Sequence, residues 1–505
     1  MATTQQQVPD SNASSGIDSE KQSIQYVEDR DMKNELEETG YIRTYADIDE
    51  GFDPKEVRRI VRKVDLHLIP ILAAMYCISL IDRTNLSMAR SANGKLMNKE
   101  LSLDQGNYYS VATMIFFIPY IILEIPSQLG LRKYGVRWWL ATAVILWGIV
   151  MMCMGFVKTP QQLIATRALL GIFEASLFPG AAFLIACWYP RKSMATRNTA
   201  FYFTSTAIGG LSSILAWGIS QMNGTANMAG WRWIFIIEGL LTICIGVVAY
   251  FFLQDFPDKA TFLNEHERHV MVTRIQRDRG DATPDPLTLR KALNYLIDPK
   301  IWLFSIMFAG TTLASYSMAF FLPTILQQMG FSNALSQILY APPKIWGIFP
   351  GIAIAWWSDK THQRAAGIVL NAILLIIGTC MFSQLGNDQK VARYAGTWLA
   401  FGGATGNVPL IIAWAQTSIR EQSKRGFNSA ILIAFGGVGG ILSGVLFIES
   451  EAKAGYPTGI WSTIGFNAFV AVMALVFKVW MTIQNRRADR GDVVLEGHPE
   501  FRYQA

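Results

Sequence analysis

The chain has 505 residues, of which 51% are hydrophobic and only 16% charged, and its formal net charge is +6. This composition is too apolar for an ordinary soluble protein, and so modest a charge does not indicate a nucleic-acid partner. The five cysteines show no CxxC spacing, so neither a disulfide framework nor a zinc site is indicated, and we expect no cofactor or metal.

The first fifty residues are polar and acidic, with stretches such as SGIDSEKQSIQYVEDRDMKNELEE. A segment with so little hydrophobic surface cannot bury enough of it to fold. We therefore expect residues 1–65 to form a disordered cytoplasmic tail, without a cleavable signal peptide.

After this tail, the apolar residues gather into runs of about 20, the length that spans a bilayer. An even number of spans puts both termini on one side of the membrane. Lys and Arg are concentrated in the loops on that side, so the positive-inside rule predicts cytoplasmic termini, here in the cell membrane. We predict an all-α membrane protein with twelve transmembrane helices, at about 66–90, 107–129, 136–157, 161–189, 198–221, 231–253, 301–327, 335–357, 365–385, 393–418, 427–448 and 459–483.

The one long connection follows the sixth span and contains a charged helix and a Pro-rich linker. The spans therefore form two six-helix halves, an arrangement common in transporters with a central site. Small residues recur in both halves, in AIGGLSS and in FGGVGGILSG, and allow helices to approach closely. After the tail, the predicted domains are an N-terminal bundle at 66–253, a bridging loop at 254–300, a C-terminal bundle at 301–483 and a cytoplasmic tail at 484–505.

Charged residues inside the predicted spans each call for a reason, because each costs about 2.5–3.5 kcal/mol to insert at bilayer depth. Two of these charged residues, Glu124 and Lys478, lie close to cytoplasmic ends of their spans, where snorkelling or interfacial pairing explains them. The deeper set is Asp82 and Arg83 in the first span, Arg167 and Glu174 in the fourth, and Lys344 in the eighth.

The helical rise places the first four of these charges in depth. Asp82 lies roughly 24 Å from the cytoplasmic edge, and Arg167 lies roughly 9 Å below the outer edge. In a core about 30 Å thick these two heights nearly coincide. Arg167 and Glu174 share a helix face but stand about two turns apart, so Glu174 is the deeper charge, near the midplane.

Two explanations of these charges stay open. In the first, Asp82 pairs with Arg167 and only clamps the first span to the fourth. In the second, the cluster binds an organic anion and a proton: Arg83 and Arg167 hold the carboxylate, while Glu174 and Asp82 take protons. Protonating one acid leaves a positive cavity that attracts an anion, which couples the two ligands.

The motif DRTNLSMA in the first span and the spacing R-x-x-x-G-x-x-E-A at 167–175 resemble a known family. They are similar to the anion:cation symporter branch of the major facilitator superfamily, and in particular to the fungal allantoate permease group. EIPSQLGLRKYG, FPDKATFLNEHERHVMVTRIQRDRGD and HPEFRYQA add to the resemblance, which covers about residues 65–505.

The resemblance implies uptake of small organic acids, vitamins or ureides together with protons. It implies that Arg83 holds the substrate carboxylate, that Asp82 and Glu174 take protons, and that Arg167 is the charge partner. The superfamily's usual latch pairs a basic cluster with an Asp. After the second span Arg132 belongs to a basic cluster without that Asp, whereas Asp359 and Arg364 keep the pattern better, so the stronger latch is expected in the C-terminal half.

The second half offers further candidate contacts. Lys344 is either an amine that reaches back to the outer interface or a second contact for an anion, which would suit a dicarboxylate. Tyr316 and Asn407 could donate hydrogen bonds to a substrate, although helix packing explains each of them at least as well.

Rival functions differ from this one in identifiable ways. HERH is not HExxH, and GGVGGILSG follows no strand, so an enzyme is not indicated. A nutrient receptor that does not transport would carry a long signalling extension, and the tails are short. A proton antiporter that exports a metabolite or drug would use the same acids, so the direction of flux stays open. The predicted partners are a small organic anion such as nicotinate, pantothenate or allantoate, protons and the bilayer, with the protein as a monomer.

Overall fold

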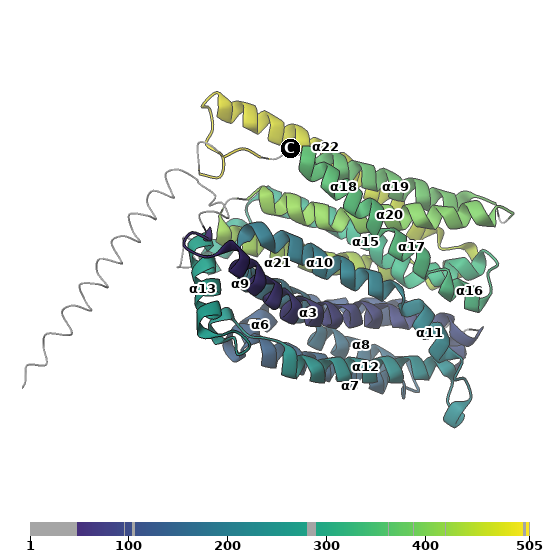
Figure 1. Cartoon of the computed structure of the whole chain (residues 1–505). Coiled ribbons are helices and arrows are strands. Elements are labelled where there is room, and N and C mark those ends of the chain that lie inside the picture. The colour runs from purple at the N-terminus through teal and green to yellow at the C-terminus, as the bar shows by residue number, and fades with distance from the viewer. Residues whose placement is uncertain are drawn as a thin grey trace, which may run out of the picture.

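The computed structural model describes residues 48–94, 96–103, 107–279, 289–361, 363–386, 388–419, 421–497 and 501–503. These residues form helices and connections without any strand, as the twelve-helix fold predicts (Figure 1). Within them, ten segments are long and apolar enough to cross a membrane, and Tyr108–Glu124 is a shorter apolar segment. Most of the predicted N-terminal tail lies outside the described residues.

Each predicted span of the N-terminal half corresponds to one helix or to two consecutive ones. The first helix begins before the predicted span, because the polar sequence from Pro54 continues the helical pattern, and Asp53 caps it through the amide of Lys55. The helices are α3 (Pro54–Ser91), α5 (Tyr108–Met114) with α6 (Phe117–Tyr134), α7 (Val136–Met154), α8 (Pro160–Glu174) with α9 (Leu177–Trp188), α10 (Arg191–Gly210) with α11 (Ser212–Ser220), and α12 (Gly230–Phe252).

The bridge contains α13 (Glu265–Arg279) and α14 (Leu289–Tyr295), and the C-terminal half follows the same scheme as the first. Its eighth span is divided into three helices. The helices are α15 (Pro299–Gln328), α16 (Asn333–Ile338), α17 (Ala341–Trp346) and α18 (Ile348–Thr361), α19 (Arg364–Gln384), α20 (Lys390–Thr417), α21 (Gln422–Leu446) and α22 (Pro457–Asp489).

Prolines cause most of the breaks within spans. A proline has no backbone N–H, and its ring collides with the carbonyl of the residue four positions earlier. Helices end at or next to that earlier residue at four places. The breaks at Ile115, Ala175, Leu339 and Gly347 precede Pro119, Pro179, Pro343 and Pro350 respectively.

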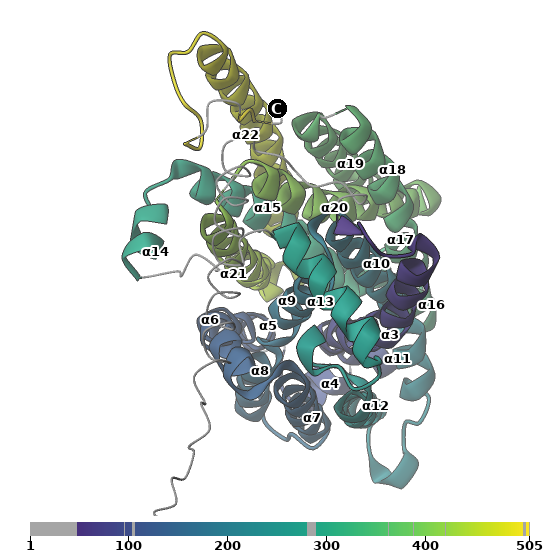
Figure 2. The ribbon, with the colours of Figure 1, turned by 60° about the vertical axis from the view of Figure 1, so that its left-hand side comes forward.

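The two halves lie side by side, with α13 across one end of the bundle, which we call the bridge end (Figures 1 and 2). Ion pairs attach α13 to the start of the chain. Lys63 contacts Glu267 at 2.7 Å, and Arg274 contacts Asp49 at 2.5 Å. Therefore α3 starts at the bridge end and runs away from it.

Hydrogen bonds between the two halves begin at about the level of Leu80 and continue to the opposite end. Ser87 donates to the Phe320 carbonyl at 2.6 Å, and Gln337 donates to the Met88 carbonyl at 3.1 Å. Tyr109 donates to the same Phe320 carbonyl at 3.3 Å. The end remote from the bridge is therefore held closed.

The predicted small-residue motif of the eleventh span lies in α21, where helices touch. A Cβ on Gly439 would lie 2.5 Å from the Ala309 carbonyl oxygen of α15, and one on Gly440 would lie 2.3 Å from the Phe117 ring of α6. Larger residues would push α21 away from α15 in its own half and from α6 in the other half. These glycines therefore set the distances of α21 from both helices.

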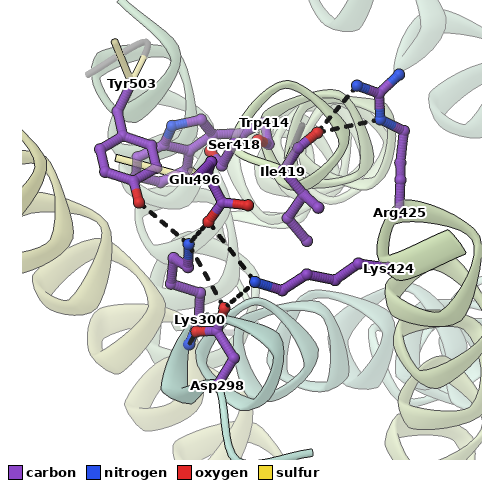
Figure 3. Close-up of polar contacts among 9 residues, drawn as sticks. All are labelled: Asp298, Lys300, Trp414, Ser418, Ile419, Lys424, Arg425, Glu496 and Tyr503. Atoms are coloured by element: carbon purple, nitrogen blue, oxygen red, sulfur yellow. Dashed lines mark hydrogen bonds and ion pairs between the residues drawn. The ribbon is translucent and has the colours of Figure 1, made fainter. Parts of the chain in front are cut away.

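Residues 491–497 and 501–503, here called the C-terminal strap, place Glu496 and Tyr503 beside Lys300 at the start of α15 (Figure 3). Lys300 donates to Glu496 and, at 3.1 Å, to the Tyr503 hydroxyl. Lys424 pairs with Asp298 at 2.7 Å. Burial favours the neutral form of Asp298, but the hydrogen bond from Lys424 and the charge of Lys300 outweigh it and hold the pKa of this carboxyl below its usual value.

A depressed pKa in the folded state stabilises the protein above the pKa of the unfolded chain, about 4, and the stabilisation is lost as pH falls through the folded value. We expect Asp298→Asn to lower the free energy of unfolding at neutral pH by about 1.5–3 kcal/mol, the range for hydrogen bonds to charged groups. Thermal unfolding in detergent should show this difference shrinking below about pH 4. The control is Asp492→Asn in the exposed part of the strap; equal melting of Asp298→Asn and wild type at neutral pH would contradict the prediction.

Candidate functional site

Three helices from both halves bring Arg83, Glu174 and Tyr316 together. The Nε of Arg83, on α3, donates to Oε1 of Glu174, on α8, at 2.5 Å, and its Nη1 donates to the Tyr316 hydroxyl, on α15, at 3.0 Å. Ser79 donates to the same Oε1 at 2.6 Å. Glu174 is fully buried, whereas the Arg83 side chain is 10% exposed. The result is a buried ion pair with a contact to the second half.

The fourth span presents Glu174 because two local features fix α8. Pro179 interrupts the helix, so Glu174 is the last residue of α8 and Ala175 caps it. Gly171 lies one turn earlier against the break between α5 and α6. A Cβ there would stand 2.1 Å from the Phe116 carbonyl oxygen, so only glycine permits this approach.

Aromatic rings surround the Arg83 guanidinium without using all of its donors. Its carbon lies 5.1 Å from the Tyr120 ring centroid and 5.6 Å from that of Phe116, distances typical of cation–π contacts. Its Nη2 makes no hydrogen bond to any described residue. A guanidinium held in this way retains N–H groups that could bind a carboxylate.

Asp82 points to a different side of α3 from Arg83. Its Oδ2 accepts hydrogen bonds from Trp147 of α7 at 2.9 Å and from Thr242 of α12 at 3.1 Å. Arg167 reaches the backbone carbonyl of Asp82, at 3.4 Å, rather than its carboxylate. The equal depth predicted for Asp82 and Arg167 agrees with this contact, but their side chains form no ion pair.

Lys344 and Asn407, the other candidates of the C-terminal half, take different positions. Lys344 is 9% exposed and donates to the Gly209 carbonyl at 3.2 Å, so its amine crosses to the N-terminal half instead of reaching the outer interface. Asn407 is fully buried in α20, and neither of its amide atoms has a hydrogen-bond partner among the described residues.

The predicted latch residues are Arg132, Asp359 and Arg364. The side chains of Arg132, in α6, and Asp359, in α18, lie outside the described part of the structure. Arg364 is the first residue of α19 and is partly buried. The latch therefore stays a prediction.

The sequence reasoning missed or discounted two buried acids. Glu238 of α12 was not singled out, yet it is fully buried. Glu124 of α6 was assigned to the interface, but it is 3% exposed, and its oxygens have no hydrogen-bond partner in the described structure. The signal for Glu238 was available, since it is an acid within the apolar run WIFIIEGLLTICIGVV.

Comparison with known proteins decides the family. The model of the Major Facilitator Superfamily matches residues 72–444. The chain belongs to this superfamily. It is similar to "MFS transporter prlL" of Fungal sp. (strain NRRL 50135), at 28% identity over 95% of this chain and 99% of that one. It is also similar to "Major facilitator-type transporter hxnP" of Emericella nidulans, at 27% identity over 89% of this chain and 91% of that one.

Two further comparisons concern a bacterial relative and the fold. A protein of Agrobacterium vitis named "Putative tartrate transporter" is 28% identical over 83% of this chain and 91% of its own length. The solved structure of a bacterial homologue of the human lysosomal transporter Spinster, inward-facing and occupied, has a TM-score of 0.61 at 16% identity, covering 84% of this chain and 97% of that one. This superfamily protein is thus a membrane transporter and not an enzyme.

The close packing at Gly171 makes a specific stability prediction. Gly171→Ala should destabilise the protein by about 1–3 kcal/mol, because the new methyl collides with a backbone carbonyl that cannot swing away. Gly218→Ala is the matched control, since it lies in α11 with nothing within 4 Å of the added Cβ. Thermal unfolding followed by size-exclusion chromatography checks both variants, and equal melting temperatures would show that the packing at Gly171 is looser than described.

Proposed function

We propose that the protein takes up a small organic anion together with protons, by alternating access. The observation that supports this most directly is the Arg83–Glu174 pair, in which a guanidinium with a free Nη2 is held against a buried carboxylate. Arg83 is the anion-binding residue in this proposal, and Glu174 is the proton acceptor.

Mutual electrostatics couple the two ligands. While Glu174 is ionised it neutralises Arg83, and an anionic substrate would have to displace a strong partner. A proton on Glu174 removes that competition and leaves the guanidinium free to pair with a carboxylate. Binding of the proton therefore favours binding of the anion, and linkage requires the reverse to hold as well.

The contact with Tyr316 relates this site to movement of the halves. Arg83 belongs to the first half and Tyr316 to the second, and the hydrogen bonds between halves run from this level to the closed end. When the halves rock against each other, this contact has to break. An anion bound between Arg83 and Tyr316 would be in contact with the site in both the inward-facing and the outward-facing state. The site then faces the bridge end, which we propose to be cytoplasmic.

The chemistry favours a carboxylate, and the resemblance to the allantoate permease group together with the tartrate relative supports that class. Arg167, Lys344 and Asn407 are proposed further substrate contacts, and Asp82 is a proposed second proton site. Asp359, Arg364 and Arg132 are proposed latch residues in a monomer of the cell membrane. We also propose that the protein is divided into the two tails, two six-helix bundles and bridging loop predicted from the sequence.

We expect uptake of a labelled carboxylate from a panel that includes tartrate, nicotinate, pantothenate and allantoate to rise as external pH falls from about 7.5 to about 4.5. Arg83→Ala should reduce that uptake roughly 10- to 100-fold, because it removes a charged hydrogen bond. Glu174→Gln should leave only exchange that does not depend on pH. The assay is uptake into cells, with the variants at matched surface levels.

Arg232→Ala is the control, since it removes an arginine from a comparable ion pair, with Glu100 at 3.0 Å, away from the site. Normal transport by both Arg83→Ala and Glu174→Gln would make the pair a structural clamp. Cytoplasmic acidification when substrate is added distinguishes uptake with protons from export by antiport.

A further inference from the structure

Glu238 lies in the middle of α12, remote from the Arg83 pair, and nothing above gives it a role. It is fully buried, and both its carboxylate oxygens lack a hydrogen-bond donor within the described structure. An ionised carboxylate in this position would cost several kcal/mol without a compensating partner. The protonation state of the Glu238 carboxyl therefore needs a physical explanation.

The polar neighbours of Glu238 on α3 are Asp82 and Asn85. Asp82 acts on Glu238 as a like charge, and Asn85 is the amide that faces it. One N–H of Asn85 donates to the Met151 sulfur at 3.0 Å, while Trp147 and Thr242 both donate to Asp82 Oδ2. The remaining N–H of Asn85 can serve at most one of the two Glu238 oxygens.

Acceptors exceed donors in this group. Both oxygens of Glu238, Oδ1 of Asp82 and Oδ1 of Asn85 have no partner among the described residues. A proton on a carboxyl converts one acceptor into a donor and can satisfy a second acceptor at the same time. These side chains therefore lack hydrogen-bond donors for their acceptor oxygens, and a bound proton would supply one.

Positive charge only partly makes up the deficit. From α8, Arg167 attracts Asp82 but contacts only its backbone carbonyl, and Glu174 acts on Asp82 as a further like charge. The groups that α7 contributes are Trp147 and Met151, which do not titrate, and α11 carries no charged residue. Two facing carboxyls that form no ion pair with a described cation cannot both ionise cheaply.

Tight packing seals this group on one side. A Cβ on Gly239, next to Glu238, would lie 2.5 Å from the Met152 amide nitrogen, and one on Gly148 would lie 2.9 Å from the Ile243 amide nitrogen. The backbones of α7 and α12 are therefore in contact, α12 also packs against α3, and side chains of α7 and α3 are joined by hydrogen bonds. Ionising both acids would force these helices apart.

We propose that Glu238 and Asp82, with Asn85 as the neighbouring amide, form a proton-binding site separate from the Arg83–Glu174 site. The pair holds at least one proton while α3, α7 and α12 are packed as described. It is a site on another face of α3, and its occupancy does not depend on which solute the protein carries.

Infrared spectroscopy of the purified protein in lipid nanodiscs tests the proposal without any substrate. At about pH 7.5 ordinary carboxyls are ionised. We expect the wild type to keep a carboxylic-acid C=O band at that pH and Glu238→Gln to lose part of it, because the glutamine amide supplies the donor that Asp82 lacks. Glu100→Gln, which alters a partly exposed carboxylate paired with Arg232, should leave the band unchanged.

Acid bands of equal intensity in wild type, Glu238→Gln and Asp82→Asn would overturn the proposal, because neither carboxyl of the pair would then hold a proton. If Glu238→Gln fails to fold, Asn85→Ala replaces it, since removal of the facing amide should shift the pH at which the band disappears. An unchanged titration of Asn85→Ala would likewise overturn it. None of these outcomes depends on anion transport, so a failure here is distinct from a failure of the proposed function.

Discussion

The centre of this structure depends on the cost of burying charge. The Arg83–Glu174 pair removes a guanidinium and a carboxylate from water, and each is stabilised mainly by the other. Losing either partner would leave an uncompensated buried charge, so α3 and α8 cannot move far apart while both are ionised. Tyr316 extends this constraint to α15, and through it to the second half.

Proline and glycine give these charges their positions. Pro179 ends α8 immediately after Glu174, and Gly171 allows that helix to contact the break between α5 and α6. Pro119 produces that same break. The site therefore depends on interrupted helices, in which backbone irregularity is tolerated because it is buried within protein.

The sequence was sufficient for the all-helical fold and for the approximate positions of the apolar helices, because length and hydropathy determine both. Depth placed Asp82 level with Arg167, and the two do touch, but through a backbone carbonyl. The rotation of each helix about its axis depends on packing between distant segments, so the Arg83–Glu174 contact could not be read from spacing. Glu238 was missed although the rule that singled out Glu174 applies to it equally.

Adjacent positions on α3 serve two environments. Successive residues of a helix point about 100° apart, so Asp82 faces α7 and α12 while Arg83 faces α8 and α15. Because a helix backbone is stiff, Arg83 cannot shift without displacing Asp82, whose carbonyl also holds Arg167. The motif DRTNLSMA therefore connects an ion pair at the junction of the halves with an acidic pair inside one half. We therefore expect a change of protonation at either place to alter the packing around the other.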